Sequence, residues 1–538
     1  MRIVGIEGTA WNASAAVFDS EAGNGGGDVL SLVTDPYVPD EGGIHPREAS
    51  EHISSAIPGV IDEALEDVSD DSIDAVAFSR GPGLGPCLRV AATASRALSL
   101  RLDVPLVGVN HTVAHIEMGR FSSGFEDPVA LDAAGANTMV TTYRNGRYRI
   151  LGETMDTGVG NSLDKFGRHV GLSHPGGPKI EELASSVDDS EYVELPYTVK
   201  GMDFSFSGII NAAQKKYDDG VEVERLAYSV QENVFGMLTE VCERALALTG
   251  KDTLVVGGGV SRNSRLREML EEMCDERGAE FESPDPDYLS DNAGMIAVLG
   301  YMMYRAGETV DVKDSHVKPD WRPDEVDVVW RDGVEESRRG DSVIHGAEAV
   351  VDFDGSEVTK TRLPKSYRSP SLDAELRRKR TVSEARLTSE ARKAGVPTPA
   401  VLDIDSHGFE LRSERIGIGT DASDLSDSGI DTEDADEIGR HLARLHSSGI
   451  AHGDPTTRNM VRSSDGRIYL IDFGLSYATR DTEDFGMDVH VLRRTLEGTV
   501  SDSDEILDAF WSGYSKVWDK ADEIYDQVRE IEERGRYL

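Results

Sequence analysis

Two histidines spaced for metal binding stand in the run Asn110-His111-Thr112-Val113-Ala114-His115. On a helix, residues four apart share one face, so both imidazoles can reach the same metal ion. The glutamate that follows the first histidine in zinc peptidases, where it acts as general base, is missing. The pair therefore favours a metal site, while a metallopeptidase stays open as a weakly supported alternative.

Three glycine-rich turns occur in the same part of the chain, and the first two could also be ordinary loops. They are GPGLGP at 81–86, HPGGP at 174–178 and GGG at 257–259. The last follows a predicted strand at 253–256 and precedes a predicted helix that begins near Arg262. A strand, a glycine turn and a helix N-terminus together suit a phosphate or nucleoside group.

A second set of chemically capable residues lies in the last third of the chain. A lysine on a predicted strand follows a turn with a single glycine, a glutamate lies on a basic helix, and HGDPTTRN and Asp-Phe-Gly follow. These residues are Gly346, Lys360, Glu384, Asp454, Asn459 and Asp472. In protein kinases the lysine positions phosphates, the asparagine and the second aspartate hold Mg²⁺, and the first aspartate orients a hydroxyl or a water. The order predicts an ATP- and Mg²⁺-binding, kinase-like domain whose catalytic residue is Asp454.

This kinase-like set is incomplete in an informative way. There is no GxGxxG loop, no His-Arg-Asp, and only a short stretch between Asp-Phe-Gly and the next acidic helix. A long activation loop and a peptide-docking platform therefore have no room. We expect an atypical kinase or ATPase.

The elements that must position these residues follow a repeated layout. Strand–turn–strand patterns occupy 3–18 and 129–143, which indicates two related halves around one nucleotide site. Apolar residues at helical spacing predict helices at 47–66, 86–101, 225–248 and 263–277. After a polar stretch, strands near 343–361 and helices at 372–394 and 434–447 are predicted. We therefore expect one domain at 1–325, a linker at 326–341 and a second domain at 342–538.

The charge of the chain is strongly acidic. Its 538 residues include 56 Lys and Arg against 99 Asp and Glu, a formal net charge of −43. Acidic charge spread along the whole chain is typical of halophilic proteins, in which salt screens the self-repulsion. Any contact with RNA phosphates must then rest on local basic patches.

Other compositional features narrow the class of protein. Three distant cysteines exclude a disulfide framework and a zinc knuckle. The N-terminus starts as a strand rather than a signal peptide, and no apolar run approaches the ~20 residues of a membrane span. We expect a cytoplasmic protein without membrane contact.

Eight ordered motifs resemble one family over about residues 1–325: the archaeal and eukaryotic threonylcarbamoyladenosine synthase of the KEOPS complex. They are GIEGTA (5–10), IHPREAS (44–50), SRGPGLGPCLRV (79–90), GVNHTVAHIE (108–117), HPGGPKIEELA (174–184), LPYTVKGMDFSFSG (195–208), VGGGVSRNSRLREML (256–270) and DNAGMIA (291–297). The resemblance implies the two-lobed α/β fold of actin, Hsp70 and sugar kinases (the ASKHA fold). It also implies transfer of threonylcarbamoyl from threonylcarbamoyl-AMP to N6 of adenosine 37, 3′ of the anticodon, in tRNAs that read codons beginning with A.

The resemblance also implies the site residues. His111, His115 and Asp291 would be metal ligands, and Asp132 stands where the family has a ligand tyrosine. A carboxylate is a competent ligand for iron, the expected metal, or for zinc or manganese. The residues implied around the adenylate are Asp132, Ala133, Ala134, Gly135, Ala136, Asp164, Gly177, Glu181 and Asn263. No general base is identified.

Residues 342–538 resemble the small, RIO-like KEOPS serine/threonine kinase, which is fused to the synthase in some archaea. The RTxxEAR helix occurs at 380–386 and the basic end at 534–538, while Pro455 and Arg458 depart from the family's leucine and serine. The resemblance implies a small α+β domain with ATPase activity that supports tRNA modification, and tRNA, ATP and other KEOPS subunits as partners. Two further alternatives are a scaffold that only binds nucleotides and a sugar kinase, which would leave the paired histidines unexplained.

Overall fold

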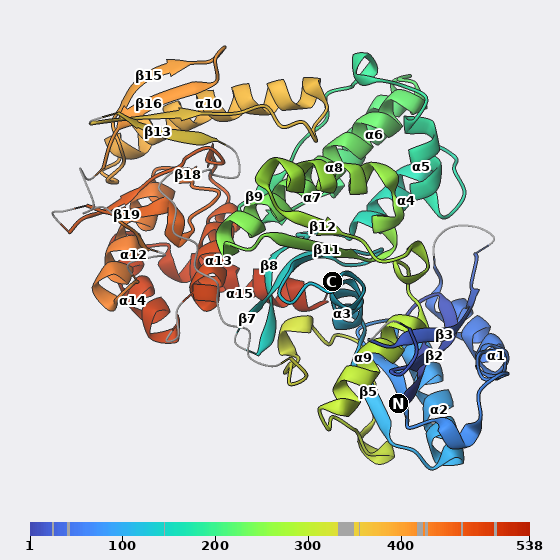
Figure 1. The fold of residues 1–538 in the computed structure, drawn as a ribbon. Coiled ribbons are helices and arrows are strands. Elements are labelled where there is room, and N and C mark those ends of the chain that lie inside the picture. The colour runs from blue at the N-terminus through green and yellow to red at the C-terminus, as the bar shows by residue number, and fades with distance from the viewer. Residues whose placement is uncertain are drawn as a thin grey trace. The chain divides into compact units, whose positions relative to one another are not determined.

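A computed structural model describes residues 1–538 except 24–25, 40–43, 145, 332–348, 355, 417–422, 426–428, 464–465, 500–502 and 538. The chain divides into two compact units (Figure 1). The first comprises 1–196, 206–235 and 251–337, and the second comprises 197–205, 236–250 and 338–538. The division at 337/338 falls inside the predicted linker. The predicted domain limits stay a prediction, and the compact division differs from them in the segments 197–205 and 236–250.

The first unit is built on two sheets of the same design. The first contains β1 (Arg2–Glu7), β2 (Asn12–Asp19), β3 (Asp28–Pro36), β4 (Ala75–Gly81) and β5 (Leu106–Asn110) in the order β3-β2-β1-β4-β5. The second contains β6 (Val129–Ala133), β7 (Thr138–Arg144), β8 (Arg147–Glu153), β11 (Thr253–Gly257) and β12 (Glu280–Glu282) in the order β8-β7-β6-β11-β12. In each sheet three antiparallel strands are followed by two parallel ones. This repeat confirms the predicted pair of related α/β halves.

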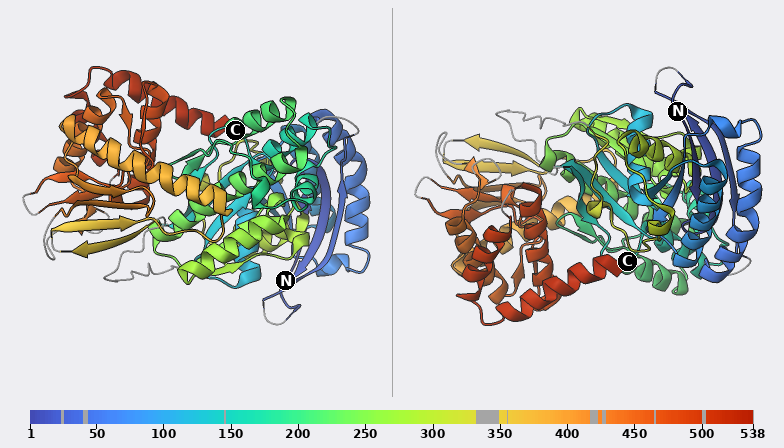
Figure 2. Two further views of the ribbon diagram at one scale, coloured as in Figure 1. Left: turned by 90° about the horizontal axis from the view of Figure 1, so that it is seen from above. Right: turned by 90° about the horizontal axis from the view of Figure 1, so that it is seen from below.

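Helices cover both faces of the first sheet. The helices that begin in this unit are α1 (Pro46–Ala64), α2 (Gly85–Leu102), α3 (His111–Ser123), α4 (Val159–His169), α5 (Gly176–Ala184), α6 (Ser207–Asp218), α7 (Val223–Thr249), α8 (Ser264–Arg277) and α9 (Ala293–Arg305). Figure 2 shows α1 along the outer side of β1–β3, and α1 and α2 share a core with the sheet that includes Ile53, Ala91 and Val4. The other face packs on α3 and α9 through Val113, Met295 and other apolar residues. Strands covered on both faces read as continuous apolar runs, as β1 and β2 do.

The second unit is a small α+β structure. Its four-stranded antiparallel sheet has the order β13-β14-β16-β15, with β13 (Val350–Asp354), β14 (Glu357–Thr361), β15 (Val401–Asp405) and β16 (Glu410–Glu414). Helix α10 (Pro370–Lys393) lies beside this sheet (Figure 1). Smaller sheets are formed by β17 (Ser423–Asp424), β19 (Met460–Arg462) and β20 (Ile468–Leu470), by β18 (Ile450–Ala451) and β21 (Tyr477–Ala478), and by β9 (Val199–Lys200) and β10 (Asp203–Phe204). The remaining helices are α12 (Thr432–Ser447), α13 (Thr482–Thr499), α14 (Ser503–Ser515) and α15 (Ala521–Tyr537), and an apolar core joins α12, α13 and α14.

The second unit contains a buried charge network around the last turns of α7. The side chain of Glu240, with no exposed surface, accepts hydrogen bonds from Tyr197 (2.7 Å), Arg368 (2.7 Å) and Arg380 (2.9 Å). One turn later, Glu243 accepts from Lys365 at 2.5 Å. The segment 236–250 therefore supplies acids to Lys365 and Arg368, which precede α10, and to Arg380, which lies in the middle of α10.

The predicted helices and strands agree with the structure to within a few residues. The predicted helices at 47–66, 86–101, 225–248 and 263–277 are α1, α2, α7 and α8, and the predicted basic helix at 372–394 is α10. The strand–turn–strand pairs at 3–18 and 129–143 are β1–β2 and β6–β7. In the part of the chain that the structure describes, no helix is long and apolar enough to cross a membrane.

Candidate functional site

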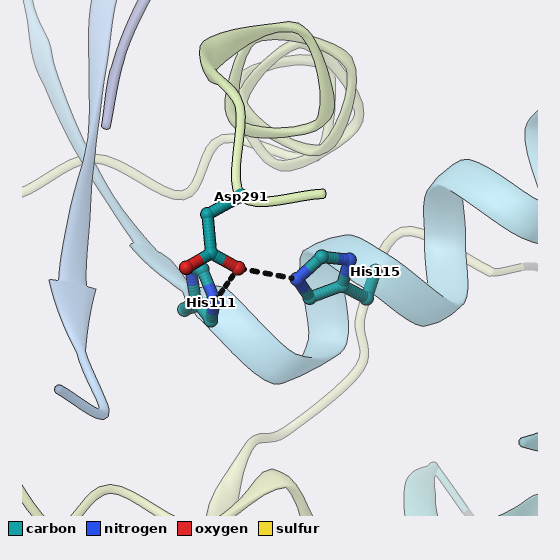
Figure 3. A group of neighbouring side chains, drawn as sticks. All are labelled: His111, His115 and Asp291. Atoms are coloured by element: carbon teal, nitrogen blue, oxygen red, sulfur yellow. Dashed lines mark ion pairs between the residues drawn. The ribbon is translucent and has the colours of Figure 1, made fainter. Parts of the chain in front are cut away.

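Three of the four predicted metal ligands converge where α3 and the start of α9 meet (Figure 3). Oδ1 of Asp291 lies 3.3 Å from Nε2 of His111 and 3.4 Å from Nε2 of His115. The potential ligand atoms of all three lie within 4.8 Å of one another. One small cation can therefore contact all three side chains.

Local structure fixes these three side chains. Asn110 ends β5 and caps α3 by accepting a hydrogen bond from the Val113 amide, so His111 is the first helical residue. Asn292 caps α9 in the same way and holds Asp291 at the helix entrance. Gly5 of β1 permits the close approach of α9, because a Cβ there would lie 2.3 Å from the carbonyl oxygen of Ala293.

A buried glutamate that the sequence analysis did not select completes the setting of His111. Oε2 of Glu7 lies 3.1 Å from Nδ1 of His111, and Oε1 accepts hydrogen bonds from the amide (2.7 Å) and hydroxyl (2.5 Å) of Thr9. A carboxylate on the second nitrogen of a ligand histidine fixes the ring's orientation and tautomer. Glu7 lies in GIEGTA, but a single glutamate on a strand has no spacing that marks it as a partner of His111.

Strong electrostatic coupling runs through the cluster. Burial opposes protonation of His111, but Glu7 and Asp291 outweigh it and hold the pKa of His111 well above its usual value. Burial also acts to raise the pKa of Asp291, yet the two histidines lower it below its usual range. The pocket thus favours a positive charge between its carboxylates, which is the charge that a bound cation supplies.

Asp132, the replacement for the family tyrosine, lies at the end of β6 with 2% of its surface exposed. Burial raises the pKa of Asp132, and the charges of His115 and His111 act to lower it. Asp132 therefore interacts electrostatically with the cluster. Its Oδ1 has no hydrogen-bond partner among the described residues. It is not one of the three residues with mutually close ligand atoms, so its role as fourth ligand stays a prediction.

The side chains present fit a divalent transition metal. Both ring nitrogens of His115 are buried without a hydrogen-bond partner in the described part of the chain, as is Oδ1 of Asp132. Leaving buried polar atoms without hydrogen bonds costs free energy. The lone pairs of these atoms, together with the ion-pair contact between Nε2 of His115 and Asp291, therefore suit a bound metal ion. Two imidazoles with carboxylates suit iron, zinc or manganese.

Four of the residues implied around the adenylate lie on α4, on α5 and at the N-cap of α8. Asp164 of α4 accepts a hydrogen bond from the Gly176 amide (2.6 Å) and lies 3.0 Å from Nδ1 of His174. Glu181 of α5 accepts from the amide of Ser264 at 2.8 Å. Asn263 caps α8 and donates to Gln231 of α7 at 3.3 Å. Asp164, Gly177, Glu181 and Asn263 are thus brought into one hydrogen-bonded region.

The turn at Ala133–Ala136 directly follows Asp132, the predicted fourth ligand. The Gly135 carbonyl accepts a hydrogen bond from the Asn161 amide at the start of α4 (2.9 Å). Gly258, whose φ is +83°, lies so near that a Cβ there would be 2.5 Å from the carbonyl carbon of Ala133. Only glycine leaves room for this contact between the two turns.

The second unit assembles the predicted lysine, glutamate and aspartate. Nζ of Lys360 on β14 lies 2.9 Å from Glu384 of α10 and 2.7 Å from Asp472. Burial opposes the charge of Lys360, but Asp472 and Glu384 keep its pKa raised. Arg362, which the sequence analysis did not select, lies 2.5 Å from the other oxygen of Glu384. Gly346 lies outside the described residues.

The loop that carries Asp454 is held by a buried aspartate, Asp488. Asn459 donates to the carboxylate of Asp454 (3.0 Å), so the predicted catalytic and Mg²⁺-binding residues are neighbours. Asp488 of α13 accepts from the amides of His452 (2.6 Å) and Gly453 (2.8 Å). Asp488 therefore fixes the backbone of the loop. It belongs to none of the motifs found in the sequence, so this role was not predicted.

The fold and the sites define the class of protein. Two equivalent sheets with glycine turns and a cluster of possible metal ligands form a unit of the actin/Hsp70-like fold class, and the second unit is a small α+β structure with a kinase-like residue set. Residues 29–298 match the family described as tRNA N6-adenosine threonylcarbamoyltransferase. The chain belongs to this family and to the tRNA threonylcarbamoyladenosine modification system.

Similar proteins span the whole chain, both units included. A relative from Haloarcula marismortui, called a probable bifunctional tRNA threonylcarbamoyladenosine biosynthesis protein, is 55% identical and covers 100% of both chains. Relatives with the same description from Halobacterium salinarum and Methanospirillum hungatei are 56% and 49% identical, and each alignment covers 100% of this chain and 99% of the relative. The first two come from halophilic organisms, in agreement with the acidic composition.

Proposed function

We propose that the first unit transfers the threonylcarbamoyl group of threonylcarbamoyl-AMP to N6 of adenosine 37 in tRNAs that read codons beginning with A. The observation that carries this proposal is the cluster of His111, His115 and Asp291, next to the Ala133–Ala136 turn. A metal site that adjoins a nucleotide-facing turn suits a reaction of an activated adenylate.

The reaction needs no covalent nucleophile from the protein. Threonylcarbamoyl-AMP is a mixed anhydride and already activated, so the chain must bind it, orient it towards the incoming amine and stabilise oxyanion charge. His111, His115 and Asp291, with Asp132 as the proposed fourth ligand, would hold a divalent metal, iron by preference, which when bound supplies Lewis acidity. Asp164, Glu181 and Asn263 would hold the nucleoside through hydrogen bonds.

Nucleoside analysis tests the transferase proposal. The full chain is incubated in molar salt with threonylcarbamoyl-AMP and unmodified tRNA, and the digested nucleosides are separated. We expect the modified adenosine with the unaltered chain, and loss of both bound metal and product in His111→Ala and His115→Ala. His52→Ala, on α1 beside Asp35, is the matched histidine control and should retain both. Retention of metal and product in the double variant of His111 and His115 would refute the assignment.

We also propose that the second unit is an ATPase with protein-kinase capacity that supports this modification together with other KEOPS subunits. The observation that supports it is the ion pair of Lys360 with Glu384, beside Asp472. Lys360 would place the ATP phosphates, Asn459 and Asp472 would hold Mg²⁺, and Asp454 would orient the attacking hydroxyl or water.

Paired measurements of ATP hydrolysis and adenylate binding test this second proposal. Asp454→Ala and Asp472→Ala should each abolish slow ATP hydrolysis and impair multi-turnover tRNA modification, without altering the affinity for threonylcarbamoyl-AMP. Asp405→Ala, at the exposed end of β15, is the control and should hydrolyse ATP normally. If Asp472→Ala weakened adenylate binding as much as substitution of Glu181 or Asn263, two separate nucleotide sites would be ruled out.

A further inference from the structure

Four cations gather around one short segment of the first unit, residues 314–319. Arg80, at the end of β4, donates to the carbonyls of Asp314 (2.8 Å) and His316 (2.9 Å). Arg96 of α2 donates to Ser315, and the amide of Lys318 donates to the carbonyl of Arg80 (2.8 Å). Arg89 of α2 is exposed and lies beside the same segment, since a Cβ on Gly85 would be 3.4 Å from its guanidinium and 3.7 Å from Pro319.

No carboxylate of the described residues forms an ion pair with these cations, in contrast to several other arginines of the same unit. Elsewhere on the same unit, Arg47, Arg101 and Arg147 each form an ion pair with an acidic side chain. Among the residues that the structure describes, none of the four cations of the cluster has a carboxylate within ion-pair distance. Acidic residues outnumber basic ones by 99 to 56, so four neighbouring cations without an ion-pair partner call for a physical reason.

The cations lie close enough to repel one another, since all four surround the segment 314–319. Burial and then the neighbouring Arg96 lower the pKa of Arg80, and burial and then Arg80 lower the pKa of Lys318. Asp314 and Glu325 act in the opposite sense but do not cancel these effects. Like charges held together attract an anion, which would relieve their repulsion.

The cluster adjoins the metal ligands through consecutive hydrogen bonds. The Gly83 amide donates to the carbonyl of Pro319, next to Lys318, and the Leu84 amide donates to Thr9, which binds Glu7. On the other side, Asn110 donates to the carbonyl of Trp321 at 3.0 Å, and His111 follows Asn110 directly. The cations therefore lie beside the loops that enclose the cluster of His111, His115 and Asp291.

An aromatic ring accompanies the cations. Nζ of Lys318 lies 4.3 Å from the centre of the Trp321 ring, so a tryptophan rather than a carboxylate holds it. Cations interleaved with an aromatic side chain are typical of surfaces that bind the phosphates and bases of single-stranded RNA loops.

We propose that Arg80, Arg89, Arg96 and Lys318 form a phosphate-binding surface for tRNA, which holds the backbone of the nucleotides next to the adenosine that enters the metal site. This surface is the local basic patch that an acidic protein needs in order to bind RNA. The inference rests on the proposed transferase function, because that function requires tRNA at this site.

The salt dependence of tRNA binding tests the proposal. The side chains of Arg80 and Arg96 also hydrogen-bond to residues 314–316, so replacing them could disturb the fold. The test therefore uses Arg89→Met and Lys318→Met, which leave those hydrogen bonds in place. The affinity of the full metal-loaded chain for unmodified tRNA is measured over a KCl series in which the melting temperature stays constant. Each variant should weaken binding and reduce the slope of log K against log salt by about 0.7–0.9, and the double variant by about twice as much.

A control variant and two distinct outcomes separate a failure of the phosphate surface from a failure of the transferase proposal. Lys313→Met removes a nearby cation that is paired with Asp311 and Asp314, and should leave the slope unchanged. Unaltered adenylate affinity in all variants shows that the nucleotide site is intact. If the unaltered chain modifies tRNA while Arg89→Met and Lys318→Met bind it with the original slope, the phosphate surface is wrong and the transferase stands. If the slopes change but no modified adenosine forms, the surface stands and the transferase proposal fails.

Discussion

At the scale of single residues, the metal cluster depends on a carboxylate that is not itself a ligand. Glu7 is fully buried and faces Nδ1 of His111, with its second oxygen satisfied by Thr9. A buried carboxylate in that place fixes which nitrogen of His111 faces Asp291 and makes that nitrogen more basic.

Replacing this carboxylate by an amide should weaken metal binding without removing a ligand. For Glu7→Gln we expect the affinity for the divalent metal to fall about 10- to 100-fold, because the charge behind His111 is lost. Competition with a coloured chelator measures the affinity. Glu63→Gln, on the exposed side of α1, is the control, and an affinity of Glu7→Gln equal to that of the control would contradict this role.

The presence of Asp132 in place of the family's tyrosine should change the visible absorption of the iron-loaded protein. A phenolate bound to ferric iron gives a charge-transfer band in the visible range, and a carboxylate does not. We expect the iron-loaded chain to lack a purple colour and Asp132→Tyr to gain it. An absorption spectrum decides the matter, since a strong visible band in the unaltered iron form would exclude Asp132 as the fourth ligand.

At the scale of elements, α10 is held at its start by acids from α7. Glu240 binds Arg368, which precedes α10, and Arg380, one turn before Glu384 on the same helix. The pairing of Glu384 with Lys360 therefore depends on a helix whose position is fixed by buried ion pairs.

Truncating Glu240 should destabilise the second unit strongly. Glu240→Ala leaves Arg368 and Arg380 buried without their partner, which costs about 3–5 kcal/mol for a buried pair. We expect the free energy of unfolding of this unit, measured by denaturant titration, to fall by that amount. Glu505→Ala, on the exposed side of α14, should change it by less than about 0.5 kcal/mol. A loss in Glu240→Ala no larger than in this control would show that the network contributes nothing.

The positions of helices and strands could be predicted from the sequence, whereas the assignment of each segment to one of the two units could not. Periodic apolar residues predict α1, α2 and α8 because each buries one stripe, and the repeated strand–turn–strand predicts the paired sheets. His111 and His115 carry their own spacing, but Asp291 lies 180 residues from His111 along the chain and was found only through a resemblance. Glu7, Arg362 and Asp488 were missed because their roles arise from contacts between distant elements. The assignment of 197–205 and 236–250 to the second unit likewise depends on buried ion pairs that no local pattern reveals.

At the scale of the whole molecule, the charge of −43 sets the conditions in which the fold is stable. The Debye length grows from ~3 Å at 1 M salt to ~10 Å at 0.1 M, so dilution restores the repulsion between acidic side chains. We expect the melting temperature to fall when salt is lowered from molar concentrations to 0.1 M. A calorimetric series in KCl measures this, and a melting temperature that is unchanged or higher at 0.1 M would contradict a halophilic design.

The make-up of the second unit bears on any attempt to dissect the protein. A polypeptide that started at residue 338 would lack Tyr197, Glu240 and Glu243, and the hairpin of β9 and β10. Arg368, Arg380 and Lys365 would then meet solvent or one another in place of their acids. Such a fragment is a poor stand-in for the ATPase in the intact protein. A fragment that keeps these contacts would have to include the β9–β10 hairpin and the last turns of α7, fused to residues 338–538.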